Sequence, residues 1–168
     1  MALAGAAALI CLGACASKPP PPAASPRAAA PAPEPKRLAW LPVETLEMPD
    51  VARTVNDHLG RVKISGATDG RKAAVSMEVA QLAIECTEPT PACYGAVGNS
   101  LGADQLLWAE LHPGPARAPT IRIALALFDV RAGTAPKRVE KTFDGVQAAR
   151  AGVADLVDHA FEGGRGSR

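Results

Sequence analysis

The chain has 168 residues, of which 48% are hydrophobic and only 4% are aromatic, and its formal net charge is +1. The part after residue 36 has the length of one ordinary domain, which excludes a multi-domain enzyme, a repeat array and a polytopic membrane protein. A nucleic-acid-binding protein needs a surplus of cations to displace counterions from phosphates, and this chain has no such surplus.

Residues 1–12 form an apolar segment, which is shorter than the roughly 20 residues that a membrane-spanning helix needs. The segment leads into Leu12-Gly13-Ala14-Cys15, where a branched apolar residue and two small residues precede a cysteine. This pattern resembles the lipobox of bacterial lipoproteins, which implies that residues 1–14 are a signal peptide cleaved before Cys15 and that Cys15 is lipidated. Because no basic residue precedes the apolar segment, the alternatives are an ordinary secretory signal with a coincidental cysteine or a cytosolic alanine-rich helix.

Residues 15–36 are rich in alanine and proline, and a run of four prolines begins at Pro19. Such a run adopts polyproline II at about 3.1 Å per residue, so the segment could hold the domain up to roughly 60 Å from a membrane surface. We interpret it as a tether, with a PxxP-type recognition site as the alternative. Ala16 follows Cys15, in place of the aspartate that retains enterobacterial-type lipoproteins in the inner membrane, which favours an outer-membrane location facing the periplasm.

The rest of the chain shows apolar patterns of strands and helices over residues 37–162, followed by a glycine-rich, flexible tail at 163–168. Apolar residues three or four positions apart indicate helices, and alternating apolar residues indicate strands. The expected elements are, in chain order, a strand at 37–43, a helix from 50 to about 60, a strand at 62–67, helices at 72–86 and 91–101, strands at 104–111, 120–130 and 137–143, and a helix at 146–161.

Each predicted helix has one apolar stripe, which we expect to face the core. The third predicted helix is followed by Gly102, which suits its carboxyl-terminal cap. The stripes, in chain order, are Val51, Val55, Leu59 and Val62; Val75, Val79, Leu82 and Cys86; Tyr94, Val97 and Leu101; and Val146, Ala149, Val153, Leu156 and Ala160.

The order β-α-β-α-α-β-β-β-α predicts a single small α/β (α+β) domain, with a mixed sheet of about five strands and helices packed mainly on one face. Three segments resemble the amino-terminal domain of TolB and its structural relatives, which include the lipoproteins CsgG and LpoB: residues 39–43, 101–107 and 126–133. They match, in turn, the opening strand, a helix-to-strand step, and a strand ending in an aspartate and a glycine turn. The resemblance covers residues 38–161 and implies a fold but no function, because the relatives do different jobs.

Cys86 and Cys93 flank a proline-rich loop between two predicted helices. In an oxidising periplasm, an even pair of cysteines at short spacing predicts a disulfide. Free buried thiols are the alternative. A redox or metal site is disfavoured, because a redox pair more often has CxxC spacing, and a zinc site would need two more ligands where no histidine or other cysteine lies nearby.

The sequence shows no arrangement of catalytic residues. His58 and His159 each follow an aspartate on a predicted helix, which is typical of a surface pair, and His112 ends a strand. The chain has no GxSxG, no phosphate-binding loop and no GxGxxG. We therefore expect no catalytic residues, no metal and no cofactor, with an enzyme lacking a recognisable motif as the alternative. Acidic residues interrupt one basic cluster, which is interpreted as a solvated hairpin face: Arg122, Arg131, Lys137, Arg138 and Lys141.

Together these patterns predict an outer-membrane lipoprotein whose domain is a non-catalytic, protein-binding accessory module of the cell envelope. Its expected partners are the membrane, through the lipid anchor, and an unidentified envelope protein, but no nucleic acid. The expected contact surfaces are the sheet edges and the loops around residues 112–119 and 86–93. The alternatives are a homo-oligomeric component of a CsgG-like secretion or envelope-spanning complex, and an LpoB-like activator of a peptidoglycan synthase.

Overall fold

The computed structural model describes residues 34–68, 70–86, 88–114 and 119–161. Contacts divide the chain into two units, Met1–Ala32 and Pro33–Arg168, and only the second contains described residues. The predicted signal peptide, the lipidation site Cys15, most of the predicted tether and the predicted tail lie outside the described residues. Among those described, no helix combines the length and hydrophobicity that a membrane span requires.

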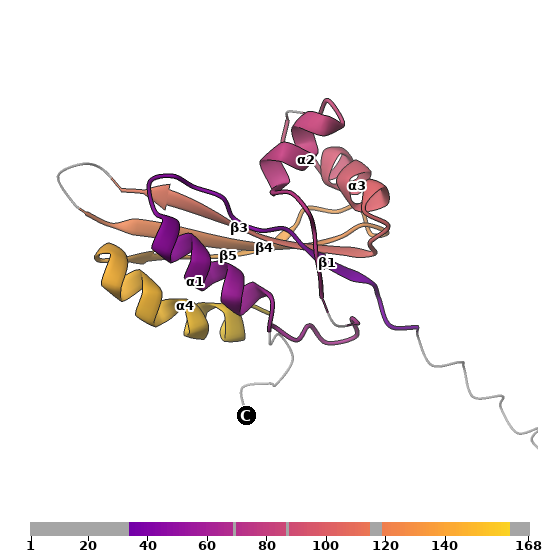
Figure 1. Ribbon diagram of the computed structural model, residues 1–168. Helices are drawn as coiled ribbons and strands as arrows, with labels where there is room; N and C mark the ends of the chain where they lie inside the picture. The colour runs from indigo at the N-terminus through magenta and orange to yellow at the C-terminus, as the bar shows by residue number, and fades with distance from the viewer. Residues whose placement is uncertain (1–33, 69, 87, 115–118, 162–168) are drawn as a thin grey trace, which may run out of the picture. The chain divides into compact units, whose positions relative to one another are not determined.

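The centre of the domain is a five-stranded mixed sheet with strand order β2-β1-β3-β4-β5 (Figure 1). The first three strands in this order run parallel, and β3, β4 and β5 form an antiparallel meander. The strands are β1 (Leu38–Trp40), β2 (Arg71–Lys72), β3 (Gln105–Pro113), β4 (Ile121–Asp129) and β5 (Lys137–Phe143).

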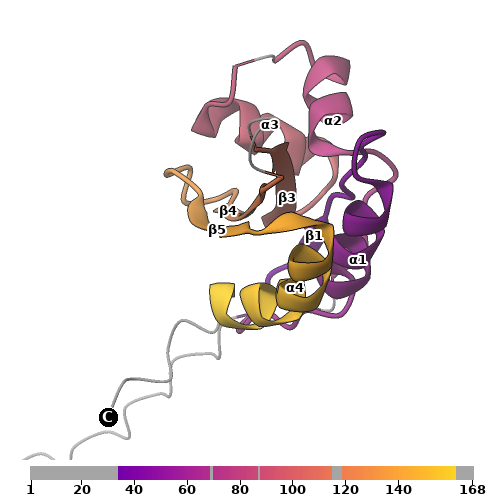
Figure 2. The same ribbon diagram turned by 90° about the vertical axis from the view of Figure 1, so that its left-hand side faces the viewer.

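Four helices cover the two faces of this sheet: α1 (Pro49–Leu59), α2 (Met77–Ala83), α3 (Pro91–Ser100) and α4 (Gly145–Phe161). Figures 1 and 2 show α1 beside α4 on one face and α2 beside α3 on the other. The predicted fold class and element order are confirmed. The sequence analysis expected the helices mainly on one face, whereas the structure divides them between both faces. The reason is that β3 and β4 carry apolar side chains on both sides of the sheet, and helices bury them on each side.

The face under α1 and α4 holds the larger core cluster. Val55 and Val153, from α1 and α4, are fully buried against Ile123 and Leu125 of β4. The stripes predicted for these helices therefore do face the core, apart from Val146 at the start of α4, which is 43% exposed, and Val62, which lies beyond the end of α1 and is partly buried.

The face under α2 and α3 holds a second cluster built around three aromatic rings. The Tyr94 ring of α3 lies 4.9 Å from the Trp108 ring of β3 and 5.6 Å from the Phe128 ring of β4, measured between centroids. Gly98 lets α3 approach the sheet, because a Cβ atom at this position would overlap the side chain of Val130. Burial of these rings fixes α3, and with it the adjoining α2, on the sheet.

The second strand and the second helix lie where the sequence analysis did not expect them. Residues 62–67 form a loop, whose strand-like pairing is limited to a bridge between Ala67 and Lys36. The second strand lies later in the chain, because β1 pairs with Arg71 and Lys72. The predicted helix at 72–86 is confined to residues 77–83. Ser76 caps its start, because the Ser76 hydroxyl oxygen accepts the Val79 N–H. The helix ends shortly before Glu85, whose backbone is in the left-handed region with φ +56°.

Candidate protein-binding surface

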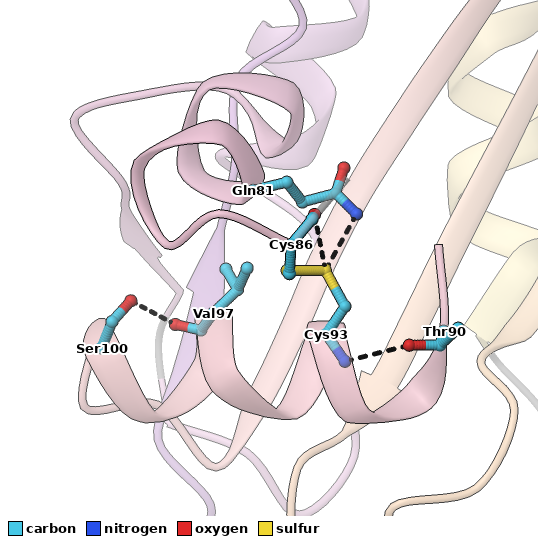
Figure 3. Close-up of a disulfide and its surroundings, with 6 residues drawn as sticks. All are labelled: Gln81, Cys86, Thr90, Cys93, Val97 and Ser100. Carbon is cyan, nitrogen blue, oxygen red and sulfur yellow. Dashed lines mark hydrogen bonds between the residues drawn. A yellow bond between two sulfur atoms is a disulfide. The ribbon is translucent and has the colours of Figure 1, made fainter. Parts of the chain in front are cut away.

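The helices α2 and α3 form a small lobe, residues 73–101 without residue 87, which a disulfide between Cys86 and Cys93 holds together (Figure 3). This pairing is consistent with the expectation from the sequence. The Thr90 hydroxyl oxygen caps α3 by accepting the Cys93 N–H at 3.3 Å, and the Gln81 amide of α2 donates to the Cys93 sulfur at 3.4 Å. A disulfide that closes so short a loop contributes about 2–3 kcal/mol to stability.

The outer face of α2 is apolar and exposed. Val79 is 43% exposed and Leu82 is 65% exposed, whereas the side of α2 that faces the core is formed by Met77 and Ala80. The sequence expectation that Val79 and Leu82 face the core is therefore wrong. Because Met77 and Ala80 face the core, the helical period of 3.6 residues places Val79 and Leu82 on the opposite, outward side of α2.

The segment that forms the lobe carries negative charge and no cation of its own. The sequence from residue 73 to residue 116 contains no lysine or arginine. Glu78 on α2 and Glu85 and Glu88 in the disulfide loop are exposed. The outer face of α2 with these carboxylates is called the lobe surface below, and it comprises Glu78, Val79, Leu82, Ala83, Glu85 and Glu88.

A shallow hollow of about 490 Å³ adjoins the disulfide. Two of the carboxylates line it, and alanine methyl groups and the disulfide form its apolar lining. Its lining residues are Glu85, Cys86, Glu88, Thr90, Ala92, Cys93 and Ala96.

A second polar cluster lies on β3 and β5, on the sheet face that α3 partly covers. The Arg138 guanidinium donates to both oxygens of Glu110, at 2.9 and 2.7 Å. The Trp108 Nε1–H also donates to Glu110, at 3.3 Å, and a ring nitrogen of His112 lies 3.2 Å from its other oxygen. The cluster connects β3 to β5 across β4. The sequence analysis missed this role of Arg138, because only the strand register shows which charged side chains lie opposite each other.

The Glu110 cluster makes stability depend on pH. The hydrogen bonds from Arg138, and secondarily those from His112 and Trp108, hold the pKa of Glu110 at about 2, below its ordinary 4.5, although burial raises it. Because the folded-state pKa is depressed, the stabilisation is present above about pH 4.5 and is lost as the pH falls towards 2. We expect Glu110→Gln to lower the free energy of unfolding near pH 7 by about 1–2 kcal/mol, allowing for solvent screening, and this deficit to shrink in acid. Denaturant titrations at neutral and acidic pH measure both values.

The matched control for that prediction is Glu140→Gln. Glu140 lies 3.8 Å from the Arg138 Nε and is half-exposed, so its loss should change stability by less than about 0.5 kcal/mol at any pH. A Glu110→Gln deficit that stayed constant from neutral to acidic pH would contradict the assigned role of the carboxylate.

The chain enters the domain through a group of ion pairs. The Arg37 backbone N–H and its Nε both donate to Asp104, at 3.0 and 2.9 Å, and Arg131 contacts the other Asp104 oxygen at 3.2 Å. Hydrogen bonds from Arg37 hold the pKa of Asp104 well below its usual range. Lys36 pairs with Asp129. These contacts fix the point at which the predicted tether joins the sheet.

The other charged residues that the sequence singled out are dispersed. His159 contacts the Asp155 carbonyl oxygen at 2.7 Å, and His112 belongs to the Glu110 cluster. Within the described residues, no three His, Cys, Asp or Glu side chains are grouped so that they could hold a metal ion. In the basic hairpin, Lys137 and Lys141 lie over aromatic rings, while the arginines at 131 and 138 pair with carboxylates. Among the described residues, the lobe surface therefore combines exposed apolar side chains with carboxylates that make no ion pair.

No protein-family model matches the chain, and no curated protein matches it. Among solved structures, it is similar to the PelC dodecamer from Paraburkholderia phytofirmans, at 17% identity over 77% of this chain and 89% of that chain, with a TM-score of 0.44. It is also similar to the LpoB C-terminal domain from Salmonella enterica, at 12% identity over 69% and 87%, with a TM-score of 0.43. A third similar structure is the hypothetical protein CT253 from Chlamydia trachomatis, at 15% identity over 71% and 87%, with a TM-score of 0.37.

Proposed function

We propose that the chain is an outer-membrane lipoprotein, anchored through Cys15, whose periplasmic domain binds another protein of the envelope and performs no chemistry. The observation that carries the binding role is the outward-facing apolar stripe of α2. Single exposed apolar residues are common on protein surfaces. Val79 and Leu82, however, lie one turn apart on the same side of one short helix, so they form a continuous patch that water solvates poorly.

The disulfide makes this patch suitable for binding. Association costs free energy whenever a loop or helix must be ordered on contact, and a surface that is already fixed avoids that cost. Cys93 is buried and joins the end of the α2 segment to α3, which packs through its aromatic residue Tyr94 onto the sheet. A disulfide also supports an exported protein, because thiols remain reduced in the cytosol.

The alternative function is that of a homo-oligomeric component of a secretion or envelope-spanning complex. The observation that favours it is the outer edge of β5, a seven-residue strand at the end of the sheet that has no further strand beside it among the described residues. Its sequence opposes strand addition, however, because it is rich in charged residues, which natural edge strands use to prevent pairing. Activation of a peptidoglycan synthase is a special case of the first proposal.

Leu82→Asp tests the proposed function in living cells. A charge in the centre of the patch should reduce chemical crosslinking to the envelope partner about ten-fold or more, as loss of an interface anchor does. Because Leu82 is 65% exposed, the variant should keep the stability of the parent chain. The measurement is the yield of crosslinked partner, with thermal unfolding recorded in parallel.

The chain offers a matched control in Leu46→Asp. Leu46 is a fully exposed leucine in the loop before α1, outside the lobe surface. Its replacement should leave the crosslinking yield unchanged. Equal yields from the parent chain and Leu82→Asp would contradict the binding role of α2, and a soluble complex of several copies in detergent would favour the oligomeric alternative.

A further inference from the structure

We infer that the segment docking on the lobe surface is a basic, apolar stretch of a partner protein, in which lysine or arginine side chains flank one or two large apolar side chains. The inference rests on the proposed function and names the chemistry of its partner. It follows from three features of the described residues: the shape of the apolar patch, the charges around it and the hollow beside it.

The apolar patch is small and linear. Val79, Leu82 and Ala83 follow one another at i, i+3 and i+4 along the exposed side of α2. Because α2 has only seven residues, the patch accommodates one or two large apolar side chains and no extended sheet or groove-filling helix. A partner must therefore obtain the rest of its binding free energy from the rim.

The rim is acidic and uncompensated. Glu78 lies one turn before Leu82, Glu85 follows three residues after it, and Glu88 is in the disulfide loop. Over the described residues these three carboxylates make no ion pair, unlike Asp104, Glu110 and Asp129, each of which is paired. Unpaired carboxylates around an apolar patch attract a cationic segment and repel an acidic one.

The hollow beside the disulfide suits a long cationic side chain. Glu85 and Glu88 supply the charge, and the methyl groups of Ala92 and Ala96 supply an apolar lining. Lysine and arginine place their methylene groups on apolar surface while the charged end stays solvated or paired. The hollow thus extends the cationic preference of the rim towards α3.

Two other occupants fit the charges less well. A membrane with anionic headgroups would repel the three carboxylates. Among the described residues of a second copy, Arg131 and Arg138 are paired with Asp104 and Glu110, and Lys137 and Lys141 lie over aromatic rings, which leaves only a few exposed cations, such as Arg122 and Arg150, without such a contact. A basic segment of another protein is therefore the occupant that the described residues favour.

The test places an apolar photocrosslinking analogue of leucine at position 82 of the full-length chain in its own cells, so that the patch keeps its apolar side chain. Mass spectrometry then identifies the crosslinked peptide. The expected product is a peptide of another protein that has a large apolar residue within one helical turn of a lysine or arginine. A crosslinked acidic peptide, a peptide of this chain or a lipid would overturn the inference.

A charge series tests the rim separately, with crosslinking yield at position 82 as the readout. The combined variant Glu78→Lys, Glu85→Lys and Glu88→Lys should reduce the yield about ten-fold. The combined variant Glu78→Gln, Glu85→Gln and Glu88→Gln should reduce it less, because neutralisation removes attraction without adding repulsion. The control is Glu44→Lys with Glu47→Lys, in the loop before α1, which should not change the yield. An unchanged yield in the lysine series would overturn the inference.

Crosslinkers at Leu46 and Thr142 distinguish a failure of the inferred docking on the lobe surface from a failure of the proposed binding function. Both positions are exposed and lie outside the lobe surface. Protein crosslinks from these positions but not from position 82 would leave the binding role intact and reject the lobe surface. The absence of protein crosslinks from all three positions would reject the binding role itself.

Discussion

Phe128→Ala is expected to lower the free energy of unfolding by about 3–5 kcal/mol, the range measured when a buried phenylalanine is truncated. Phe128 is fully buried near the end of β4 and lies against the Tyr94 ring. Removing the ring loses its transfer free energy and leaves a cavity, because neither the sheet nor the disulfide-linked lobe can collapse around a smaller side chain. In a domain of this size, such a loss approaches a third or more of the total stability.

Equilibrium denaturation of Phe128→Ala measures this loss. Phe128→Leu is the graded control, because it retains most of the apolar volume and should cost clearly less. Leu46→Ala is the surface control and should change the free energy of unfolding by less than about 0.5 kcal/mol, because Leu46 is fully exposed. A Phe128→Ala deficit below about 1 kcal/mol would show that α3 does not seal this face of the sheet.

The sequence predicted those elements of the fold that one local pattern of apolar residues determines. The strand at 137–143 and the helix at 91–101 have nearly the bounds that alternation and helical spacing predict. The sequence does contain a signal for the division of helices between the two faces. Leu106, Leu107 and Trp108 are consecutive apolar residues, and all three are buried. A continuous apolar run in a strand indicates burial on both sides, which requires helices on both faces.

The candidate surface was predictable only in part. The sequence analysis named the loop between Cys86 and Cys93 as a contact surface, and the lobe surface lies on and beside it. It assigned Val79 and Leu82 to the core, because helical spacing shows that an apolar side exists and does not show what covers that side. The available signal for the shorter helix was Ser76, whose preference for the N-cap position places the start of α2 at Met77.

Cys15→Ala is expected to remove the protein from the outer-membrane fraction almost completely. A single acyl chain binds a bilayer only marginally, whereas each buried methylene adds about 0.8 kcal/mol, so the several chains of a mature lipoprotein hold it stably. Without the thiol, neither lipidation nor cleavage before residue 15 can occur. Loss of the anchor should also reduce crosslinking to a membrane-associated partner, although the lobe surface is unchanged.

Cys11→Ala is the matched control, because Cys11 lies in the same apolar segment, four residues before the predicted lipidation site. It should leave the protein in the membrane fraction, since only a cysteine preceded by Leu-Gly-Ala has the lipobox pattern. Fractionation on a density gradient separates outer from inner membrane, and the mass of the mature amino terminus identifies the acyl chains. If Cys15→Ala remained in the outer-membrane fraction as fully as the parent chain, the anchor would have to lie elsewhere. The tether would then lose its assigned role, while the binding role of the domain could still hold.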